Sequence, residues 1–377
     1  MIRLTVPLIE EDDLAAVREV LLSGMLVQGP RVAAFEAAVA SRAGVTHAVA
    51  VSNGTAALHL ALLALDVRPG DLVLVAAYSW PATANVVELC GAQPVFIDVI
   101  PETGNMDPAA LGASLDRLMA LPETARRVRA VLPVHAFGQL ADMLPILAHA
   151  NRHGIPVVED AACALGAMLD GRPAGSWGVF ACFSFHPRKA VTTGEGGAIV
   201  TRDPVLAKRL RVLRNHGLDP EAPSPDFVQA GFNYRLTEFQ AALGECQMRK
   251  LDRVISARRA LAAGYAERFA ENRITLPVIP PGHAPVHQSF VVGLNDADSQ
   301  RRGDIIRRLR EAGVETTIGT WHLPLTRFFR SRYGHRVGEF PGADRAFARA
   351  LTLPLYPGMS GDQQDQVVAA LNSILGH

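Results

Sequence analysis

Lysine is nearly absent from this chain. Of its 377 residues 37 are basic, and all of these except Lys189, Lys208 and Lys250 are arginines. Arginine stays protonated, whereas a lysine can lose its proton and attack a carbonyl. Lys208 and Lys250 lie in charged, helix-like stretches, so we expect both at the solvated surface. Lys189 instead follows the apolar run VFACFSF and precedes a glycine-rich turn, so it is either a loop cation or a reactive amine.

Excess charge and long apolar runs are absent too. The 37 acidic residues balance the basic ones, whereas a nucleic-acid-binding protein usually shows a basic excess. No apolar run approaches the roughly 18 residues of a membrane span. The first residues, MIRLTVPLIEEDD, turn acidic too early for a signal peptide. We therefore expect no nucleic-acid partner, no membrane association and a cytoplasmic location.

Cysteine is sparse, and the cysteines are far apart in the sequence. The four cysteines, Cys90, Cys163, Cys182 and Cys246, form no C-x-x-C pair and lie in apolar contexts. This spacing argues against a zinc ribbon and a disulfide framework, and it fits a reducing compartment. His149 and His153 have the i, i+4 spacing of a zincin without its glutamate, so we expect no metal there.

Short β-rich runs alternate with helical runs up to about residue 245. The expected strands are 46–51, 71–77, 93–99, 129–136, 155–160, 180–185 and 197–201. Helical patterns at 55–65 and 143–153 lie between some of them. Nearly continuous apolar strands that alternate with helices predict an α/β fold, with a mostly parallel central sheet covered by helices on both faces.

The pattern changes towards the C-terminus. A long helical stretch without proline begins near Thr237 and could bridge to a second unit. The proline-rich segment 277–287 follows, and then a strand (QSFVVGL), an arginine-rich helix (QRRGDIIRRLREAG) and a strand (VETTI). We predict a large domain at 1–250 and a smaller α+β domain at 251–377.

Three features at strand ends could form a site with Lys189. The segment VSNGTAALHL passes from a strand into a helix, whose first amides suit a phosphate, although plain capping would also explain the turn. Glu159 and Asp160 end the strand IPVVED, where an acid either caps a helix or holds a protonated heterocyclic nitrogen. Tyr78 and Trp80 follow another strand, where a ring is either part of the core or stacks on a flat cofactor.

Taken together, these features describe a site for pyridoxal 5'-phosphate (PLP). The lysine would anchor the cofactor aldehyde as a Schiff base, and the acid would keep the pyridine nitrogen protonated. The ring then acts as an electron sink.

The chain also resembles the DegT-type (DegT/StrS) nucleotide-sugar aminotransferases, PLP-dependent enzymes of the aspartate-aminotransferase-like fold, fold type I. The segments that carry the resemblance are LVQGPRVAAFE, SNGTAALHLAL, TANVVELCGAQPVFIDV, LPVHAFGQLADM, VVEDAACALGA, SFHPRKAVTTGEGGAIVT, LRNHG and GFNYRLTEFQAALG. The combination of S-F-x-P-x-K with G-x-N-Y-R is specific.

The resemblance implies a role for each matching residue. Lys189 would be the catalytic lysine, Asp160 would meet the pyridine nitrogen, and Trp80 would stack on the ring. The phosphate would be held by Gly54, Thr55, Ala56 and Ser184, and by Asn233 reaching in from the partner subunit of a homodimer. Val27, Gln28, His186 and His322 are candidates for substrate contact.

Two positions depart from the family pattern. Cys163 stands where family members commonly have Gln or His in contact with the ring hydroxyl, so that contact is open. The loop TWHLPLTRFF at 320–329 replaces the frequent H-Y-x-P, and His322 and Trp321 are candidates to take over its substrate contacts.

The resemblance implies an aminotransferase that moves an amino group, with glutamate as the expected donor, to a keto group of a nucleotide-linked sugar. Such a reaction belongs to deoxyamino-sugar biosynthesis. One alternative is a PLP-dependent sugar dehydratase, although relatives with that chemistry typically lack the Schiff-base lysine. Another is a PLP-binding regulatory protein without turnover. The nucleotide, the sugar and the aminated carbon stay open.

Overall fold

A seven-stranded sheet forms the centre of the larger part of the chain. The computed structural model describes residues 1–219, 221–269, 274–295 and 299–376. The strands of this sheet are β1 (His47–Val51), β2 (Leu72–Ala76), β4 (Gln93–Ile97), β5 (Val128–Leu132), β6 (Val158–Asp160), β9 (Phe180–Ser184) and β10 (Gly197–Thr201). Their order is β1-β10-β9-β6-β5-β2-β4, with the bridges Val131–Val157 and Val134–Asp160 joining β5 to β6.

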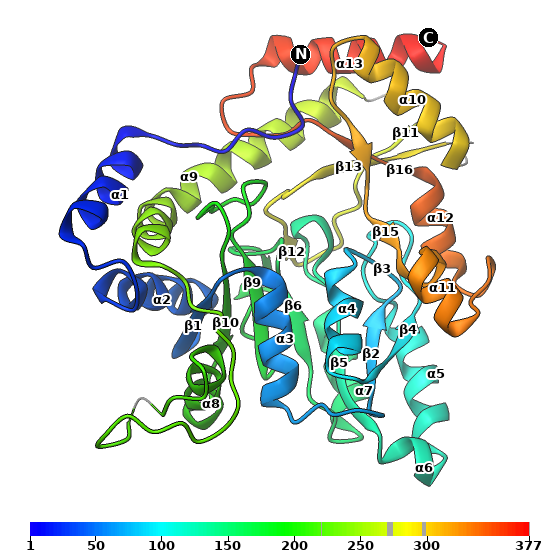
Figure 1. Ribbon diagram of the computed structural model, residues 1–377. Helices are drawn as coiled ribbons and strands as arrows, with labels where there is room; N and C mark the ends of the chain where they lie inside the picture. The colour runs from blue at the N-terminus through cyan, green and yellow to red at the C-terminus, as the bar shows by residue number, and fades with distance from the viewer. Residues whose placement is uncertain (220, 270–273, 296–298, 377) are drawn as a thin grey trace.

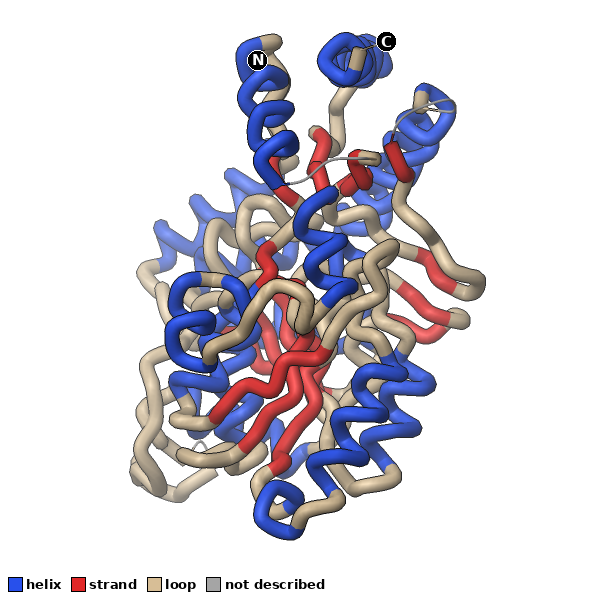
Figure 2. Tube along the Cα trace, turned by 90° about the vertical axis from the view of Figure 1, so that its right-hand side faces the viewer, coloured by secondary structure: helices blue, strands red, loops and turns tan. Residues whose placement is uncertain are grey.

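The sheet is mostly parallel. The β6–β9, β5–β6, β2–β5 and β2–β4 pairings are parallel, while β10 runs antiparallel to both β1 and β9. All five residues of β2, LVLVA, are buried, and so are all five of β10, GAIVT. Such continuous burial requires cover on both faces. Figure 2 shows the strands in the middle of the molecule with helices on either side.

The helices of this larger part connect the strands and cover the sheet. They are α2 (Pro30–Ala43), α3 (Gly54–Ala64), α4 (Ala82–Leu89), α5 (Pro108–Met119), α6 (Pro122–Ala125), α7 (Met143–Asn151) and α8 (Pro204–Arg214). α3 packs against β9 and β10, α4 against β2 and β4, and α8 against β1. The predicted α/β class with a mostly parallel sheet is therefore confirmed.

A second, antiparallel sheet lies towards the C-terminal end. Its order is β11 (Ile274–Thr275), β13 (Phe290–Leu294), β16 (Ala350–Leu353) and β14 (Thr317–Ile318). The helices α10 (Ser299–Glu311), α12 (Pro341–Arg349) and α13 (Gly361–Leu375) accompany it. Its hydrophobic cluster includes Tyr265, Phe290 and Leu371, and it also takes in Ile2 from the start of the chain. In Figure 1 the first residues lie beside α13.

One long helix connects the two parts. α9 (Glu238–Arg268) begins at the expected position, because the Thr237 hydroxyl and the Gln240 side chain form a capping box there. α1 (Glu11–Ser23) and α2 pack on its first half, and Tyr265 near its end belongs to the second hydrophobic cluster. The predicted boundary at residue 250 falls inside this helix, and the division into two domains stays a prediction.

Several short elements tie distant segments together. β3 (Tyr78–Ser79) pairs with β15 (Trp321–His322), and β7 (Met168–Leu169) pairs with both β8 (Arg172–Pro173) and β12 (His283–Ala284). Two 3-10 turns, η1 (Ala136–Gly138) and η2 (Leu323–Leu325), and helix α11 (Arg327–Tyr333) complete the described elements.

The expectation for Lys250 was wrong. Its side chain is only 9% exposed, and its Nζ lies 2.8 Å from Asp13 Oδ2 and 3.2 Å from Glu10 Oε2. Burial alone would lower its pKa, but the hydrogen bonds that Nζ donates to Asp12, Asp13 and Glu10 outweigh burial and raise it. Lys208 is 38% exposed and pairs with Glu221 at 2.7 Å, as a surface lysine does. Within the described residues, no helix is long and apolar enough to cross a membrane.

Candidate active site

Lys189 lies in the connection between the antiparallel strands β9 and β10. The Phe185 amide donates to Gly196 O at 2.8 Å, which closes this connection at its base, and the Lys189 amide donates to His186 O at 2.8 Å. The half-buried Lys189 side chain donates from Nζ to Cys163 Sγ at 3.0 Å. The lysine therefore meets the residue at which the sequence departs from the family pattern. Cys163 is itself only half-buried, whereas Cys90, Cys182 and Cys246 are buried as expected.

Asp160 ends β6 beside this connection and is buried. Its Oδ2 accepts a hydrogen bond from the Thr83 hydroxyl at 2.7 Å, and its Oδ1 accepts one from the Ala162 amide at 3.2 Å. Burial raises its pKa above the ordinary 3.8, although these hydrogen bonds and the charge of Lys189 act in the opposite direction. A protonated ring nitrogen against Asp160 would stabilise the charged carboxylate, so the residue fits that partner.

The neighbouring acid Glu159 has a different environment. Its carboxylate accepts hydrogen bonds from the amides of Gly175, Trp177 and Gly178 and contacts His135 Nε2 at 2.9 Å. The Ala141 amide donates to His135 Nδ1, which leaves the ring proton on Nε2 to be donated to Glu159. Burial raises the pKa of Glu159, but these donors outweigh it and the net pKa is lowered. Glu159 is thus bound by three amides and a histidine, whereas Asp160 has two hydrogen-bond donors in the described residues and can accept another.

The start of α3 lies against the end of β9. Asn53 caps the helix by accepting from the Ala56 amide at 2.8 Å. A Cβ at Gly54 would stand 2.9 Å from Ser184 Cβ, so only glycine lets the serine lie this close to the first turn. The amides of Gly54 and Thr55 at the helix start and the adjacent Ser184 hydroxyl form a set that suits a phosphate, while the Ala56 amide is bound to Asn53. Gly54, Thr55, Ala56 and Ser184 are therefore brought together as expected.

Trp80 follows β3 and is 65% exposed, whereas Tyr78 is buried. The β3–β15 pairing places Trp321, which is 40% exposed, opposite Ser79. The 320–329 loop is therefore anchored next to Trp80. Tyr78 accepts a hydrogen bond from the Thr320 amide at 3.1 Å, and burial raises its pKa to about 12. Of the two aromatic candidates, Trp80 is the one with a face open to a ligand.

His322 lies in the same hairpin but is only 2% exposed. Its ring contacts the rings of Phe340 and Phe347 edge-on, and Asp344 Oδ1 lies 3.2 Å from its Nε2 without hydrogen-bond alignment. Burial lowers its pKa although Asp344 acts in the opposite direction. Of the two candidates in this loop, the structure therefore leaves Trp321, and not His322, accessible to a ligand.

The other substrate candidates lie in two loops. Val27 is 47% exposed and bridges to Thr237, and Gln28 has a left-handed φ of 57°. The half-buried His186 accepts from the Arg188 amide at 3.2 Å, and burial lowers its pKa. Asn233 is exposed, and the chain next to it runs beside the start of α3, because the Ser52 amide donates to Tyr234 O at 2.9 Å.

A buried arginine behind the lysine could not be predicted from its own segment. Arg258 of α9 is 2% exposed, and its Nη1 donates to Gln288 O at 3.2 Å and to Gln288 Oε1 at 3.1 Å. Its Nη2 lies 3.5 Å from Lys189 O, and the Gln288 amide donates to Arg188 O. Burial lowers the pKa of Arg258 to about 10. Arg258 of α9 and Gln288 thus contact the main chain of the lysine loop at Lys189 and Arg188.

The comparisons with known proteins bear on this arrangement. Residues 7–372 match the model of the DegT/DnrJ/EryC1/StrS aminotransferase family. The chain belongs to this family. It is a PLP-dependent sugar aminotransferase of fold type I, which confirms the predicted family, fold, enzyme class and cofactor.

Relatives cover nearly the whole chain. The GDP-perosamine synthase of Caulobacter vibrioides is 39% identical over 345 residues, 90% of this chain and 89% of its own. The aminotransferase TlmJ from Streptoalloteichus hindustanus is 33% identical, with a TM-score of 0.90 over 100% of this chain and 99% of its own. Spr1654 from Streptococcus pneumoniae, solved in PMP and PLP forms, is 26% identical with a TM-score of 0.92; the PMP-form match covers 99% of each chain.

Proposed function

We propose that this enzyme transfers an amino group from glutamate to a keto group of a nucleotide-linked sugar. The observation that carries the proposal is the meeting of Lys189, the buried acid Asp160 and the start of α3 at one edge of the sheet. The GDP-perosamine synthase relative, named for a nucleotide-linked amino sugar, supports this class of acceptor.

Each residue of the site has a proposed task. PLP, when bound, supplies an electron sink for the bond broken at the donor α-carbon. The amides at Gly54 and Thr55 and the Ser184 hydroxyl hold the phosphate, and Ala56, whose amide is bound to Asn53, completes the turn around it. Asp160 keeps the pyridine nitrogen protonated, and the exposed face of Trp80 covers the ring.

Lys189 is proposed to move the proton. As a neutral amine, its Nζ takes the proton from the donor α-carbon and later returns one to the carbon that receives the amino group. Cys163 Sγ accepts from Nζ in this structure, so the thiol orients the amine. Arg258 and Gln288 act through the main chain of the lysine loop and are positioning residues.

The remaining residues are assigned to the substrate and the partner subunit. Val27, Gln28 and His186 lie in loops, and Trp321 lies beside Trp80, where a sugar nucleotide could be held. His322 stays a candidate only if its burial is relieved. We propose that Asn233 contacts the phosphate of the neighbouring subunit in a homodimer.

The test is a two-stage reaction. PLP-loaded protein is mixed with glutamate while the visible absorbance of the cofactor is followed, and a panel of nucleotide keto-sugars that includes GDP-linked ones is then added. We expect the absorbance to change with glutamate and one sugar to gain the mass of an amine in place of its carbonyl oxygen. A product that has lost oxygen without gaining nitrogen would indicate a dehydratase. No turnover with any donor or sugar would favour a regulatory protein.

A further inference from the structure

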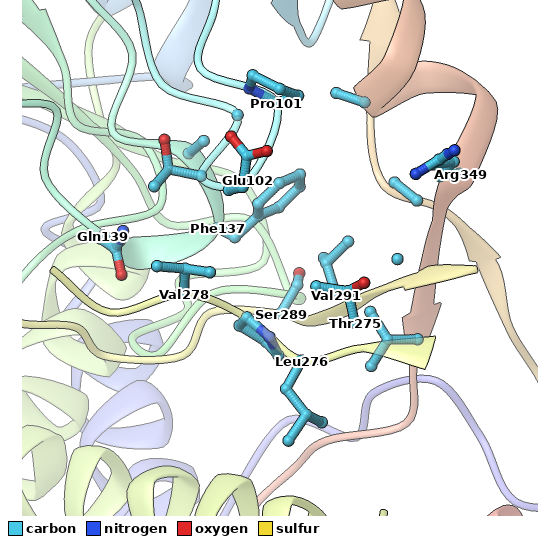
Figure 3. Close-up of a pocket in the computed structure, with 18 of the residues that line it drawn as sticks. Pro101, Glu102, Phe137, Gln139, Thr275, Leu276, Val278, Ser289, Val291 and Arg349 are labelled. Carbon is cyan, nitrogen blue, oxygen red and sulfur yellow. The ribbon is translucent and has the colours of Figure 1, made fainter. Parts of the chain in front are cut away.

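A cavity of about 110 Å³ is lined by none of the candidate cofactor-binding residues. One wall comes from the loop Pro101–Gly104 and from η1, and the other from 275–278, β13 and the end of α12 (Figure 3). Neither Lys189 nor Asp160 nor Trp80 lines it. The proposed transamination therefore leaves this cavity without a role.

Two polar side chains without a hydrogen-bond partner in the described residues line this cavity. Gln139 is only 8% exposed, yet its side-chain amide makes no hydrogen bond within the part of the chain that the structure describes. The Ser289 hydroxyl, which also lines the cavity, has no partner among those residues either. Ser289 is half-buried and Gln139 nearly buried, so a ligand that enters the cavity can form hydrogen bonds with both the hydroxyl and the amide.

The cavity carries one uncompensated positive charge. Arg345 Nη1 lies 3.8 Å from Glu102 Oε1, which balances these two lining residues. Arg349 has no carboxylate within ion-pair distance in the described residues. Burial and the charges of Arg259 and Arg258 lower the pKa of His287 to about 4, so its ring adds no charge at neutral pH. An arginine fork binds a carboxylate through two parallel hydrogen bonds.

The polar groups are spread along the cavity with apolar surface between them. Figure 3 shows Gln139 at one end and Arg349 at the other, with Phe137, Ser289 and Val291 in between. Phe137 adopts a left-handed φ of 56°, a costly conformation for a bulky residue that often marks a ligand site. A ligand with a polyhydroxylated carbon chain matches this alternation of polar and apolar groups. Its C–H groups can pack on the Phe137 ring while its hydroxyls reach the Gln139 amide.

We propose that this cavity binds a small hydroxylated monocarboxylate of the sugar-acid class. The carboxylate pairs with Arg349, and hydroxyl groups along the chain bond to Ser289 and Gln139. This site is separate from the transamination site, and either assignment can fail without the other.

The test uses three probes of related shape. Calorimetry with PLP-loaded enzyme measures the binding of D-gluconate, which has both charge and hydroxyls, of hexanoate, which lacks the hydroxyls, and of sorbitol, which lacks the charge. We expect gluconate to bind about tenfold more tightly than hexanoate, the scale of one or two buried hydrogen bonds, and sorbitol to show no measurable binding.

Variants assign the binding to the cavity. Arg349→Gln should weaken gluconate binding by about tenfold or more, the loss of a charge-assisted pair, and should keep transamination. Arg330→Gln, an exposed arginine of α11 outside the cavity, is the matched control and should bind as wild type does. Gln139→Leu should remove the preference for gluconate over hexanoate. This variant tests the same cavity independently, so the test stands even if Arg349→Gln fails to fold.

Three results would overturn the proposal. The first is no binding of gluconate at millimolar concentration. The second is equal gluconate affinity in wild type, Arg349→Gln and Gln139→Leu. The third is inorganic phosphate binding as tightly as gluconate and being lost in Arg349→Gln, because the cavity would then select an anion and not a sugar acid.

Discussion

Lys189 differs from the two other lysines in its hydrogen-bond partners. Lys208 and Lys250 are bound to carboxylates, which raise the pKa of each. The side-chain partner of Lys189 in the described residues is the Cys163 thiol, a weak acceptor. An amine that is not held in an ion pair by a carboxylate can more readily bond to the cofactor aldehyde and can more readily take up or release a proton.

Replacing Lys189 by arginine tests its chemistry apart from its charge. Lys189→Arg should keep the fold and lose covalent cofactor attachment and essentially all transamination, because a guanidinium cannot act as the nucleophile. Borohydride reduction followed by peptide mass spectrometry measures the attachment. Lys208→Arg is the matched control and should be labelled like wild type. Cofactor attached to Lys208 or Lys250 in the wild type would contradict the assignment.

Asp160→Asn tests the acid at the ring nitrogen. The variant should still attach the cofactor at Lys189, but its transamination rate should fall by about a hundredfold, the scale of losing one well-placed electrostatic group. A rate loss of less than about threefold would show that Asp160 is only structural. Single-turnover absorbance changes with glutamate measure the rate directly.

The same substitution, which lowers the transamination rate, should raise the stability of the cofactor-free protein. Burial holds the folded-state pKa of Asp160 above its value of 3.8 in the unfolded chain. Its ionisation therefore costs stability above the folded pKa, and this cost disappears as the pH falls towards 3.8. Apo Asp160→Asn should unfold at higher temperature than apo wild type at neutral pH, and the difference should shrink in acid. An equal difference at both pH values would rule out this account.

Individual strands and long helices could be predicted because their apolar residues follow the period of the element. The seven strands of the central sheet appear close to the expected ranges, and α9 begins at its capping box. The two-residue strands β3 and β15 could not be predicted, since they form only because residues 78 and 322 meet in space.

The candidate site divides in the same way. The lysine, the acid and the helix start lie at strand ends that can be recognised locally. Arg258 lies 69 residues from the lysine carbonyl it approaches, and nothing in its own segment marks it. The acids that bury Lys250 are likewise more than 230 residues away, so a charged helical stretch was mistaken for a solvated one.

Glu238, the first residue of α9, caps a different helix. Its carboxylate accepts hydrogen bonds from the amides of Gly29, Arg31 and Val32, all at 2.9 Å, at the start of α2. Glu238→Gln turns one acceptor oxygen into a donor that faces these amides. We expect the free energy of unfolding to fall by about 1–3 kcal/mol, measured by denaturant titration.

The control for this change lies on the same helix. Glu267 is exposed, and Glu267→Gln should leave the stability unchanged. Because the cap also fixes the loop that carries Val27 and Gln28, Glu238→Gln should raise the KM for the sugar more than it lowers kcat. Equal stability of the two variants would show that the cap contributes nothing.

At the scale of the whole molecule, the open question is whether two chains share each active site. Asn233 is exposed, and its neighbour Tyr234 is bonded to Ser52 of its own chain, so a partner role is a proposal about the assembled dimer. Closed two-fold pairing is the commonest route to reciprocal contacts. Lys189→Ala and Asn233→Asp, which sets a negative charge against the phosphate, should each be poorly active alone.

Co-expression of these two variants separates the possibilities. In a shared-site dimer one site collects both substitutions and the other is intact, so a mixed dimer should regain about half of the wild-type activity. Differently tagged chains allow the mixed dimer to be purified and assayed. Mixed dimers that form without regaining activity would show that each chain works with its own residues.

The first residues of the chain pair with residues that are made about 310 positions later. Ile2 pairs with Val314, and the Leu4 amide donates to Glu315, 311 residues further along. On the ribosome these N-terminal residues must therefore wait, unpaired, until residues 314 and 315 have been made. The larger sheet can assemble while the chain is still growing, but the second hydrophobic cluster cannot close before the last helix emerges. A fragment beginning at residue 251 would lack the N-terminal residues that pair with Val314 and Glu315. We expect this fragment to aggregate unless a peptide of residues 1–6 is supplied.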